Sequence, residues 1–342
     1  MSAVVNARFR RQPLTGVQRV AATLVDRLDV AIEEQAPGGP AAGLAGHLWE
    51  QVVLPTKVKS RLLWSPSNVG PIAVGRQVLT IHDTAVLDHP EWFKPAFVQT
   101  YRAIWRHLSP RVTLVTVSNF SRERLSAHLG RPLSSIHVVP NAAGEAFHPA
   151  SVEDICEARR AAGLGARPYF LTLSTAEPRK NLPLVIRAWA QARARLPKGV
   201  KLAIAGGAGA GNIFANALSM AGAEDVLILG RLPDSLLPGL ISGAWGLIYP
   251  SLYEGFGLPI VEAMACGAPA VTTRLASLPE VAGDAAIYVD AEDPDELARA
   301  FVDLAGSPDL RAGLKEKGLQ RARGFDWDRS AAQMGALLTS LM

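Results

Sequence analysis

Short runs of hydrophobic residues alternate along the chain with longer segments in which apolar and polar positions recur at helical spacing. The short runs are apolar at consecutive positions, so they predict strands buried on both faces, as in a parallel sheet covered by helices. Between them, residues 16–28 and 95–108 predict helices. The predicted strands are 78–81, 112–117, 136–139, 169–173, 201–205, 226–229, 246–249, 270–273 and 286–289.

This alternation of strands and helices occurs twice, with a break near residues 140–151. A length of 342 residues is also enough for two domains of ordinary size. We therefore expect an α/β fold with two Rossmann-like, doubly wound parallel-sheet domains at 1–150 and 151–325, and a helix at 326–342 that crosses back to the first domain. Open parallel sheets bind ligands beyond the carboxyl ends of their strands, so two such domains facing one cleft would suit a nucleotide-linked substrate.

The composition excludes several other classes of protein. With 49% hydrophobic and 19% charged residues, the chain is not of the disordered type. Two cysteines, Cys156 and Cys266, are too few for a disulfide scaffold or a four-ligand zinc site. No run of apolar residues approaches membrane-spanning length, and Arg8, Arg10 and Arg11 interrupt any signal-peptide core. These features predict a soluble, cytoplasmic protein.

Positive charge is concentrated in the first half of the chain. Residues 1–150 contain 16 Lys and Arg against 10 Asp and Glu, whereas residues 151–342 contain 19 against 21. This asymmetry is either chance or a sign that the first half contacts a phosphate-bearing partner or the anionic inner face of the cytoplasmic membrane. Nucleic acid is not expected as a partner, because no basic run or series of base-stacking aromatics accompanies the charge.

One segment, Tyr249–Pro269 (YPSLYEGFGLPIVEAMACGAP), combines the end of a predicted strand, a glycine-containing loop and a helix. The helix is expected to begin near Pro259, since proline suits the first helical turn. Gly255 and Gly257 let the backbone approach a ligand closely because they lack a Cβ. The segment therefore predicts a binding site at the carboxyl end of this strand.

Backbone amides and two acids in this segment suit a phosphorylated sugar. The N–H groups of Phe256, Gly257 and Leu258 precede the helix, where they and the helix dipole attract an anion or sugar hydroxyls. Glu254 lies before the helix and Glu262 about one turn inside it, so the two carboxylates are placed to hold different parts of one ligand. The alternative is that they are an ordinary loop acid and an ordinary first-turn acid.

Two adjacent cations, Arg179 and Lys180, follow the predicted strand at 169–173. Such a pair suits a leaving pyrophosphate, because cations stabilise the charge that develops on it in the transition state. The alternative is a solvated pair at the start of a helix.

Together these segments resemble the retaining glycosyltransferases of the GT-B fold, in particular glycosyltransferase family 4. Glu254–Glu262 (EGFGLPIVE) resembles that family's E-x7-E motif, and Ser174–Asn181 (STAEPRKN) resembles its phosphate-binding E-P-R-K-N segment. Leu14–Arg19 (LTGVQR) is similar to its T-G-(V/I)-x-R loop, and Ile81–Asp83 (IHD) to a strand end that carries a sugar-contacting histidine in many members. Val139–Asn141 (VPN) resembles the end of the first domain, so the likeness extends over nearly the whole chain.

The resemblance implies roles for the matching residues. Glu254 would contact the hydroxyls of the donor sugar and Glu262 the ribose, while Arg179 and Lys180 would hold the diphosphate. Many family members space these two cations several residues apart, so the main diphosphate ligand stays open. The residues implied to be catalytic are Glu254, His82, Arg179 and Lys180. Those implied to bind the donor are Gly16, Arg179, Lys180, Arg231, Leu232, Glu254, Gly255, Phe256, Gly257, Leu258 and Glu262, and those on the acceptor side are Thr15, Gln18 and Arg19.

The activity implied by the resemblance is retaining, metal-independent transfer of a hexose from a nucleoside diphosphate sugar to a saccharide hydroxyl. Similarity to polysaccharide mannosyltransferases favours GDP-mannose as the donor. The expected acceptor is a lipid-linked saccharide in the synthesis of a bacterial surface polysaccharide such as lipopolysaccharide. Two alternatives stay open: a sugar-nucleotide epimerase of the same fold, and a nucleotide-sugar-binding protein without activity.

Two D-x-D spacings, Asp293–Asp295 and Asp326–Asp328, are a feature of metal-dependent transferases of the other major fold. Both occur late in the chain, outside the predicted cleft. We interpret them as surface helix caps and expect neither a metal ion nor another cofactor.

Aromatic and basic residues are interleaved between Trp92 and His107. This pattern predicts either a helix whose aromatic face packs in the core or a helix that faces a membrane near a lipid-linked acceptor. The residues concerned are Trp92, Phe93, Lys94, Phe97, Tyr101, Arg102, Trp105, Arg106 and His107.

Overall fold

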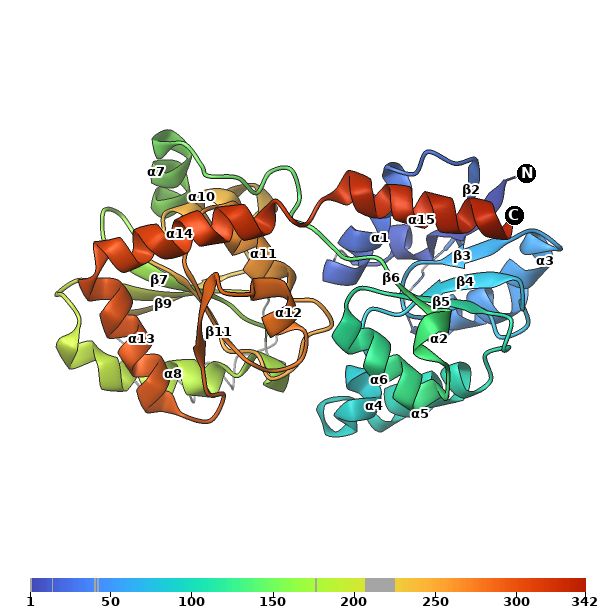
Figure 1. The fold of residues 1–342 in the computed structure, drawn as a ribbon, viewed down its shortest axis with the longest axis horizontal. Coiled ribbons are helices and arrows are strands. Elements are labelled where there is room, and N and C mark those ends of the chain that lie inside the picture. Colours follow the sequence, from blue (N-terminus) through green and yellow to red (C-terminus); the bar gives the residue numbers. More distant parts are fainter. Residues whose placement is uncertain (1, 14, 40, 42, 176, 207–224) are drawn as a thin grey trace. The chain divides into compact units, whose positions relative to one another are not determined.

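The computed structural model describes residues 2–13, 15–39, 41, 43–175, 177–206 and 225–342. The chain divides into two compact units, one of Met1–Asn141 with Asp326–Met342 (unit 1) and one of Ala142–Phe325 (unit 2) (Figure 1). The division therefore falls after Asn141, whereas the sequence analysis placed it at residue 150. The backbone N–H of Ala150 donates to Ser242 Oγ at 3.0 Å, which ties the end of this connecting segment to unit 2.

Unit 1 contains a six-stranded sheet in the order β2-β1-β3-β4-β5-β6, with every neighbouring pair parallel. Its strands are β1 (Ala3–Asn6), β2 (Ile32–Gln35), β3 (Leu63–Ser65), β4 (Gln77–Thr80), β5 (Thr113–Thr116) and β6 (Ile136–Val138). Its α-helices are α1 (Gly16–Asp26), α2 (Gly43–Leu48), α3 (Leu54–Val58), α4 (Ala85–Asp88), α5 (Pro95–Arg106), α6 (Asn119–Leu129) and α15 (Trp327–Leu341).

Unit 2 contains a second parallel six-stranded sheet, in the order β12-β11-β10-β7-β8-β9. Its strands are β7 (Tyr169–Leu173), β8 (Lys201–Ala205), β9 (Val226–Gly230), β10 (Leu247–Tyr249), β11 (Ala270–Thr273) and β12 (Ala286–Val289). Its α-helices within the described residues are α7 (Val152–Ala161), α8 (Leu182–Ala192), α10 (Leu237–Ser242), α11 (Leu258–Ala265), α12 (Leu278–Ala282), α13 (Pro294–Gly306) and α14 (Pro308–Ala322).

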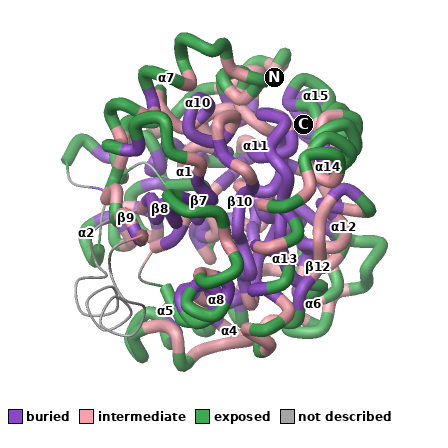
Figure 2. Tube along the Cα trace, turned by 90° about the vertical axis from the view of Figure 1, so that its left-hand side faces the viewer, coloured by how far each residue is buried: buried purple, intermediate pink, exposed green. Residues whose placement is uncertain are grey.

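The strand order of unit 2 reverses between β7 and β10. The chain proceeds outward from β7 to β9 on one side, and from β10 to β12 on the other. In doubly wound sheets, the crevice beyond the carboxyl ends of the strands at such a reversal is the usual place for a ligand. Strands β7, β8 and β10 are buried (Figure 2), so the loops that follow them extend from a rigid base.

The predicted strands are confirmed, four of them to the residue: β7, β8, β11 and β12. The predicted helices at 16–28 and 95–108 are α1 and α5, each ending two residues earlier. Three strands of unit 1, β1 to β3, are absent from the predicted set. Strand β2 reads IEEQ at the edge of the sheet and is partly exposed, so no apolar run marks it, and β3 has only three residues.

Helix α15, the last element of the chain, packs against α1 in unit 1 (Figure 1). Ser330 Oγ donates to the carbonyl oxygen of Pro140 at 2.7 Å, and Arg76 donates to the last two backbone carbonyls of the chain. Met334 and Leu338 are fully buried. The last helix is therefore part of the core of unit 1.

No helix in the described ranges is both long enough and apolar enough to span a bilayer.

We expect Leu338→Ala to destabilise unit 1 selectively, by about 2–5 kcal/mol, because it leaves a cavity under α15. Hydrogen exchange read by mass spectrometry should accelerate in peptides from residues 1–141 and stay unchanged in peptides from unit 2. Thr339→Ala, at an exposed position on the same helix, is the matched control. Unchanged exchange in residues 1–141 would contradict the assignment of α15 to the core of unit 1.

Candidate functional site

Two loops meet at the reversal of the strand order in unit 2. One follows β7 and contains the short 3-10 helix Pro178–Lys180, and the other follows β10 from Pro250 to Gly257. The backbone N–H of Leu252 donates to the carbonyl oxygen of Arg179 at 2.7 Å, and Ser251 Oγ lies 2.9 Å from that same oxygen. These bonds join the loop bearing Arg179 and Lys180 to the loop bearing Glu254.

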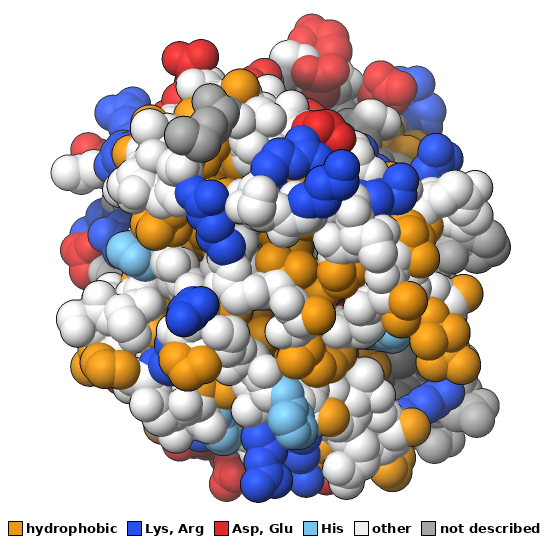
Figure 3. Space-filling model, turned by 90° about the vertical axis from the view of Figure 1, so that its right-hand side faces the viewer, with side chains coloured by type: hydrophobic (Ala, Val, Ile, Leu, Met, Phe, Trp, Pro, Cys, Tyr) orange, Lys and Arg blue, Asp and Glu red, His pale blue; other side chains and the backbone are white. Residues whose placement is uncertain are grey.

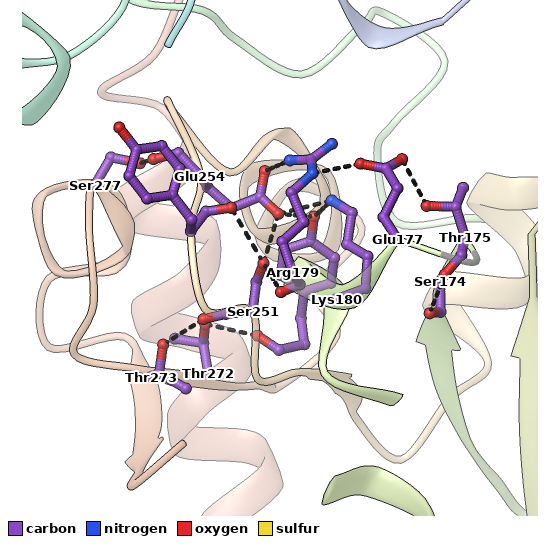
Figure 4. A network of polar contacts seen from close by, with 12 residues as sticks. Ser174, Thr175, Glu177, Arg179, Lys180, Ser251, Glu254, Thr272, Thr273 and Ser277 are labelled. Carbon is purple, nitrogen blue, oxygen red and sulfur yellow. Dashed lines mark hydrogen bonds and ion pairs between the residues drawn. The ribbon is translucent and has the colours of Figure 1, made fainter. Parts of the chain in front are cut away.

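The carboxylate of Glu254 is the centre of the polar network in Figure 4. Its Oε2 accepts from Arg179 Nη1 at 2.9 Å, and its Oε1 accepts from Lys180 Nζ at 2.6 Å. The hydroxyls of Tyr249 and Ser251 each lie 2.7 Å from Oε1 as well. The structure therefore brings together three predicted site residues, Glu254, Arg179 and Lys180, in direct contact.

A second carboxylate completes the charge of this cluster. Arg179 Nε donates to Glu177, whose other oxygen accepts from Thr175 Oγ1 at 2.8 Å. Lys180 Nζ also donates to the hydroxyl of Tyr249 and lies 4.8 Å from the centre of its ring. Two cations thus face two carboxylates, so the formal charge of the cluster is zero.

The cluster is sheltered from water and its charges are coupled. The side chains of Glu254, Lys180 and Arg179 are 9%, 11% and 22% exposed. Burial alone raises the pKa of Glu254, but the charges of Lys180 and Arg179 and the hydrogen bonds from Lys180 and Tyr249 lower this pKa to about 2. Burial raises the pKa of Tyr249 well above its ordinary value, and the Glu254 charge acts in the same direction. At neutral pH, Glu254 is therefore a carboxylate and Tyr249 a protonated hydrogen-bond donor.

Side-chain hydroxyls from neighbouring elements fix the backbone of the Glu254 loop. Thr272 Oγ1 donates to the carbonyl of Tyr249 at 2.9 Å, and Thr273 Oγ1 donates to that of Ser251 at 2.8 Å. Ser277 Oγ donates to the carbonyl of Glu254 itself at 2.9 Å. The loop is therefore held from β11 and from the residue before α12.

The predicted loop-to-helix transition after Glu254 is confirmed, with α11 beginning at Leu258 and Pro259 in its first turn. Gly257 caps the helix with a φ of 99°, a conformation that side chains rarely adopt, and a Cβ there would lie 2.9 Å from a methyl of Leu278. Glycine is thus required at 257 for both reasons. Glu262 lies one turn inside α11 and is buried, but the bonds that hold Glu254 do not include it.

His82 lies just beyond β4 in unit 1 and is buried. Its Nε2 is 2.9 Å from the carbonyl oxygen of Pro66, so this nitrogen carries the hydrogen. Burial lowers the pKa of His82, although the Pro66 bond and Asp83 oppose the shift. The ring is therefore neutral, and Nδ1 is its remaining acceptor. Its backbone N–H donates to Asn68 Oδ1 at 2.7 Å, which fixes the residue at the strand end.

The predicted acceptor-side residues lie at the start of α1. Thr15 is the N-cap position, and its hydroxyl donates to Gln18 Oε1 but accepts no hydrogen bond from the backbone N–H groups of α1. Gln18 in turn donates to Gln12 at 3.0 Å. Gly16 is the first residue of the helix, and Arg19 follows within its first turn. Leu14 of this motif and Ala176 of the E-P-R-K-N segment lie outside the described residues.

Arg231 and Leu232 follow β9, the edge strand, two strands away from β7. Among the described residues, neither Arg231 nor Leu232 forms a hydrogen bond or ion pair with Glu254, Arg179 or Lys180. Their predicted role beside the nucleotide base stays a prediction.

The interpretation of the D-x-D spacings as helix caps is confirmed. The carboxylate of Asp293 accepts from the backbone N–H groups of Asp295 and Glu296 at the start of α13. Asp326 accepts from the N–H of Arg329 at the start of α15. Each first aspartate thus caps the start of a helix.

The prediction that aromatic residues of α5 pack in the core is confirmed. Trp105 is buried, and Phe93 and Tyr101 pack against the same core cluster. Phe93 and Tyr101 are half-buried, whereas Phe97 is exposed, at 41%. Sequence reasoning also missed Tyr249 and Ser251, although both stand in the segment it singled out, because their bonds to Glu254 depend on how the loop folds back.

Comparison with known proteins identifies a protein family for most of unit 2. The sequence model of the family described as Glycosyl transferases group 1 matches residues 154–321. O-antigen chain mannosyltransferase B from Escherichia coli is 30% identical over 282 residues, which is 80% of this chain and 73% of that protein. A GDP-mannose-dependent alpha-(1-6)-phosphatidylinositol monomannoside mannosyltransferase from Mycolicibacterium smegmatis is 28% identical over 249 residues, 70% of this chain and 65% of that one.

Solved structures share the architecture over the full chain. WaaG, a glycosyltransferase involved in lipopolysaccharide biosynthesis, aligns with a TM-score of 0.77 at 15% identity, covering 99% of this chain and 100% of its own. Anabaena HepE in complex with UDP and glucose aligns with a TM-score of 0.75 at 20% identity and the same coverage. At these identities the likeness shows the fold.

We expect the Glu254 carboxylate to stabilise unit 2 above about pH 4.5 and to lose this effect as the pH falls towards 2, because folding lowers its pKa. The shift corresponds to about 3 kcal/mol. Glu254→Gln should therefore unfold at lower urea concentration at pH 7, and its difference from the parent protein should shrink with acidification. Glu316→Gln, on the exposed face of α14, is the control. A difference that is independent of pH would contradict the ion-pair assignment.

Proposed function

This chain belongs to the group 1 glycosyl transferases and is a glycosyltransferase of GT-B fold, and we propose that it transfers mannose, with retention at the anomeric carbon, from GDP-mannose to a saccharide hydroxyl. The observation that carries the proposal is the contact of Glu254 with Arg179 and Lys180 at the reversal of the strand order in unit 2. These three groups provide an acceptor for sugar hydroxyls and two donors for a diphosphate.

Donor binding requires the cluster to exchange its partners. A nucleoside diphosphate sugar brings two negative charges to a site whose formal charge is zero, so its phosphate oxygens must replace carboxylate oxygens at Arg179 and Lys180. Glu254 is then released to accept hydrogen bonds from the sugar. Glu177 stays on the other side of Arg179 and keeps its guanidinium oriented.

The reaction needs no protein nucleophile. The bond between the anomeric carbon and the β-phosphate oxygen breaks, and a bond to the acceptor oxygen forms on the same face of the sugar. The acceptor proton passes to the departing phosphate oxygen. Arg179, Lys180 and the free N–H groups at the start of α11 stabilise the negative charge that develops there. The protein's contribution is thus electrostatic, and we propose that it requires no metal.

GDP-mannose is proposed because of the activities of the relatives. The E. coli relative is named as an O-antigen chain mannosyltransferase, and the mycobacterial one as GDP-mannose-dependent. The UDP and glucose bound in HepE support the use of a nucleoside diphosphate sugar and make UDP-glucose the second candidate donor. We assign the ribose to Glu262 and the border of the base to Arg231 and Leu232.

Unit 1 is proposed to bind the acceptor, a lipid-linked saccharide of a bacterial surface polysaccharide. The start of α1, with Thr15, Gln18 and Arg19, and the neutral His82 offer hydrogen-bonding groups for hydroxyls. Contact of this unit with an anionic membrane would keep the enzyme near such an acceptor.

We expect Glu254→Gln to lower kcat by about a hundredfold or more, because a neutral amide accepts hydrogen bonds from the sugar hydroxyls more weakly than a carboxylate does. Assays with GDP-mannose and a mannose-terminated saccharide, run in EDTA, should give a product heavier by one hexose by mass spectrometry. Glu316→Gln should keep full activity. Turnover of the donor without a saccharide acceptor, to an isomeric nucleotide sugar, would favour an epimerase instead.

Among GDP, UDP, ADP and dTDP sugars, we expect GDP-mannose to raise the thermal unfolding temperature most. A ligand at a hundred times its Kd stabilises the folded state by about 2.7 kcal/mol. Arg179→Gln and Lys180→Gln should each reduce this shift, and the larger reduction identifies the main diphosphate ligand. A larger shift with UDP-glucose would contradict the mannose assignment.

A further inference from the structure

A cavity of about 540 Å³ lies in unit 1, where the ends of α5 and α6 converge. This volume falls within the range of roughly 300–1,000 Å³ that is usual for small-molecule sites. One part of its wall is apolar and the other is basic. It is lined by Leu87, Arg102, Trp105, Arg106, Leu108, His128, Leu129 and Arg131.

Three guanidinium groups meet at this cavity with no carboxylate to balance them. Arg102 and Arg106 are exposed, stand one turn apart on α5, and have no hydrogen-bond or ion-pair partner among the residues that the structure describes. Arg131 donates to the backbone carbonyls of Pro110 and Ser109 at 2.6 and 2.7 Å, which are neutral acceptors. Like charges one turn apart on a helix repel each other, so this arrangement is unfavourable until an anion enters.

Asp88, an acid next to this wall, is already bonded to two cationic or ionisable side chains. Asp88 accepts from His128 Nε2 at 2.8 Å and from the guanidinium of Arg124. Its side chain is only 5% exposed. It therefore orders α6 against α4 and leaves the charges of Arg102, Arg106 and Arg131 uncompensated.

We propose that this cavity is a second anion site, which binds a phosphate monoester whose organic part is apolar. Guanidinium groups match phosphate oxygens with paired hydrogen bonds, and a monoester carries close to two negative charges at neutral pH. Leu87, Leu108 and Leu129 provide a surface for the apolar part. The indole of Trp105 is fixed behind them, because its Nε1 donates to the carbonyl of Asn68 at 2.9 Å.

The position of the cavity separates it from the donor site. Ser109 and Pro110, which hold Arg131, come just before β5, so they lie at the edge where the strands of unit 1 begin. Ligands of doubly wound sheets bind at the opposite edge, and the Glu254 cluster belongs to unit 2. The proposal is thus independent of the reaction. Figure 3, which looks onto a face of unit 1, shows Lys, Arg and His side chains gathered beside hydrophobic ones at the bottom of the view.

Helix ends supply a competing explanation for the same residues. Arg106 closes α5 and His128 lies in the last turn of α6, and cations at helix carboxyl ends are stabilising without any ligand. This effect acts on each helix separately and predicts no binding. It therefore differs from the proposal in a measurable way.

The test compares the full chain with the variant Arg102→Gln/Arg106→Gln, whose folding is checked by circular dichroism. Titration calorimetry with n-hexyl phosphate, a soluble monoester with an apolar organic part, should show binding to the parent protein that is about tenfold weaker or lost in the variant. Sedimentation with phosphatidylcholine vesicles, with and without phosphatidic acid, presents a phosphate monoester on a lipid. Binding of only the soluble ester, or only of the vesicles, supports the proposal and identifies the source of the phosphate.

Two controls separate this site from others. Arg187→Gln removes an exposed arginine on α8 in unit 2 and should leave both kinds of binding unchanged. Arg179→Gln should weaken GDP-mannose binding and leave n-hexyl phosphate binding intact. The proposal is overturned if neither probe binds, if the double variant binds as the parent does, or if Arg179→Gln abolishes the binding instead. A double variant with lower thermal stability and unchanged binding would assign the arginines to the helix ends.

Discussion

The ionised carboxylate of Glu254, held between Arg179 and Lys180, is the interaction on which the candidate site in unit 2 depends. Burying three charges is costly, and removing one member of such a group leaves the others uncompensated at a cost of about 3–5 kcal/mol. The hydroxyls of Tyr249 and Ser251 and the backbone bonds to β11 serve to keep this carboxylate in place. In the proposed function, a diphosphate would replace one anion by another, so the site would bind its donor by exchange rather than by filling a positively charged hollow.

The sequence was most informative about the fold where a strand is a mostly apolar run of four or five residues. Strands β7, β8, β11 and β12 are such runs, as a covered parallel sheet requires, and they were predictable to the residue, although β12 is a half-buried edge strand. Strand β2, with Glu33 and Glu34 at a partly exposed edge, carries no such requirement, so its position depends on pairing with β1. The division after Asn141 likewise depends on contacts such as that of Ala150 with Ser242.

Three members of the Glu254 cluster were predictable from the sequence, but the geometry that joins them was not. Glu254, Arg179 and Lys180 were each assigned to a donor sugar or diphosphate from local motifs. That they bind one another follows from bonds between positions about 75 residues apart, which no local pattern encodes. The same applies to Tyr249, whose hydroxyl is directed by the fold of the loop after it. His82 could be placed at a strand end, but its bond to Pro66 comes from a separate loop.

The return of α15 to unit 1 has a consequence for the order of folding during synthesis. Unit 2 is continuous in sequence, so all of its residues have left the ribosome before Met334 and Leu338 emerge. The other segments of unit 1 precede unit 2 in the sequence, yet their core is closed by a helix that follows unit 2. The first unit is therefore incomplete while unit 2 is synthesised, and the face of α1 that packs on α15 stays uncovered until α15 has emerged.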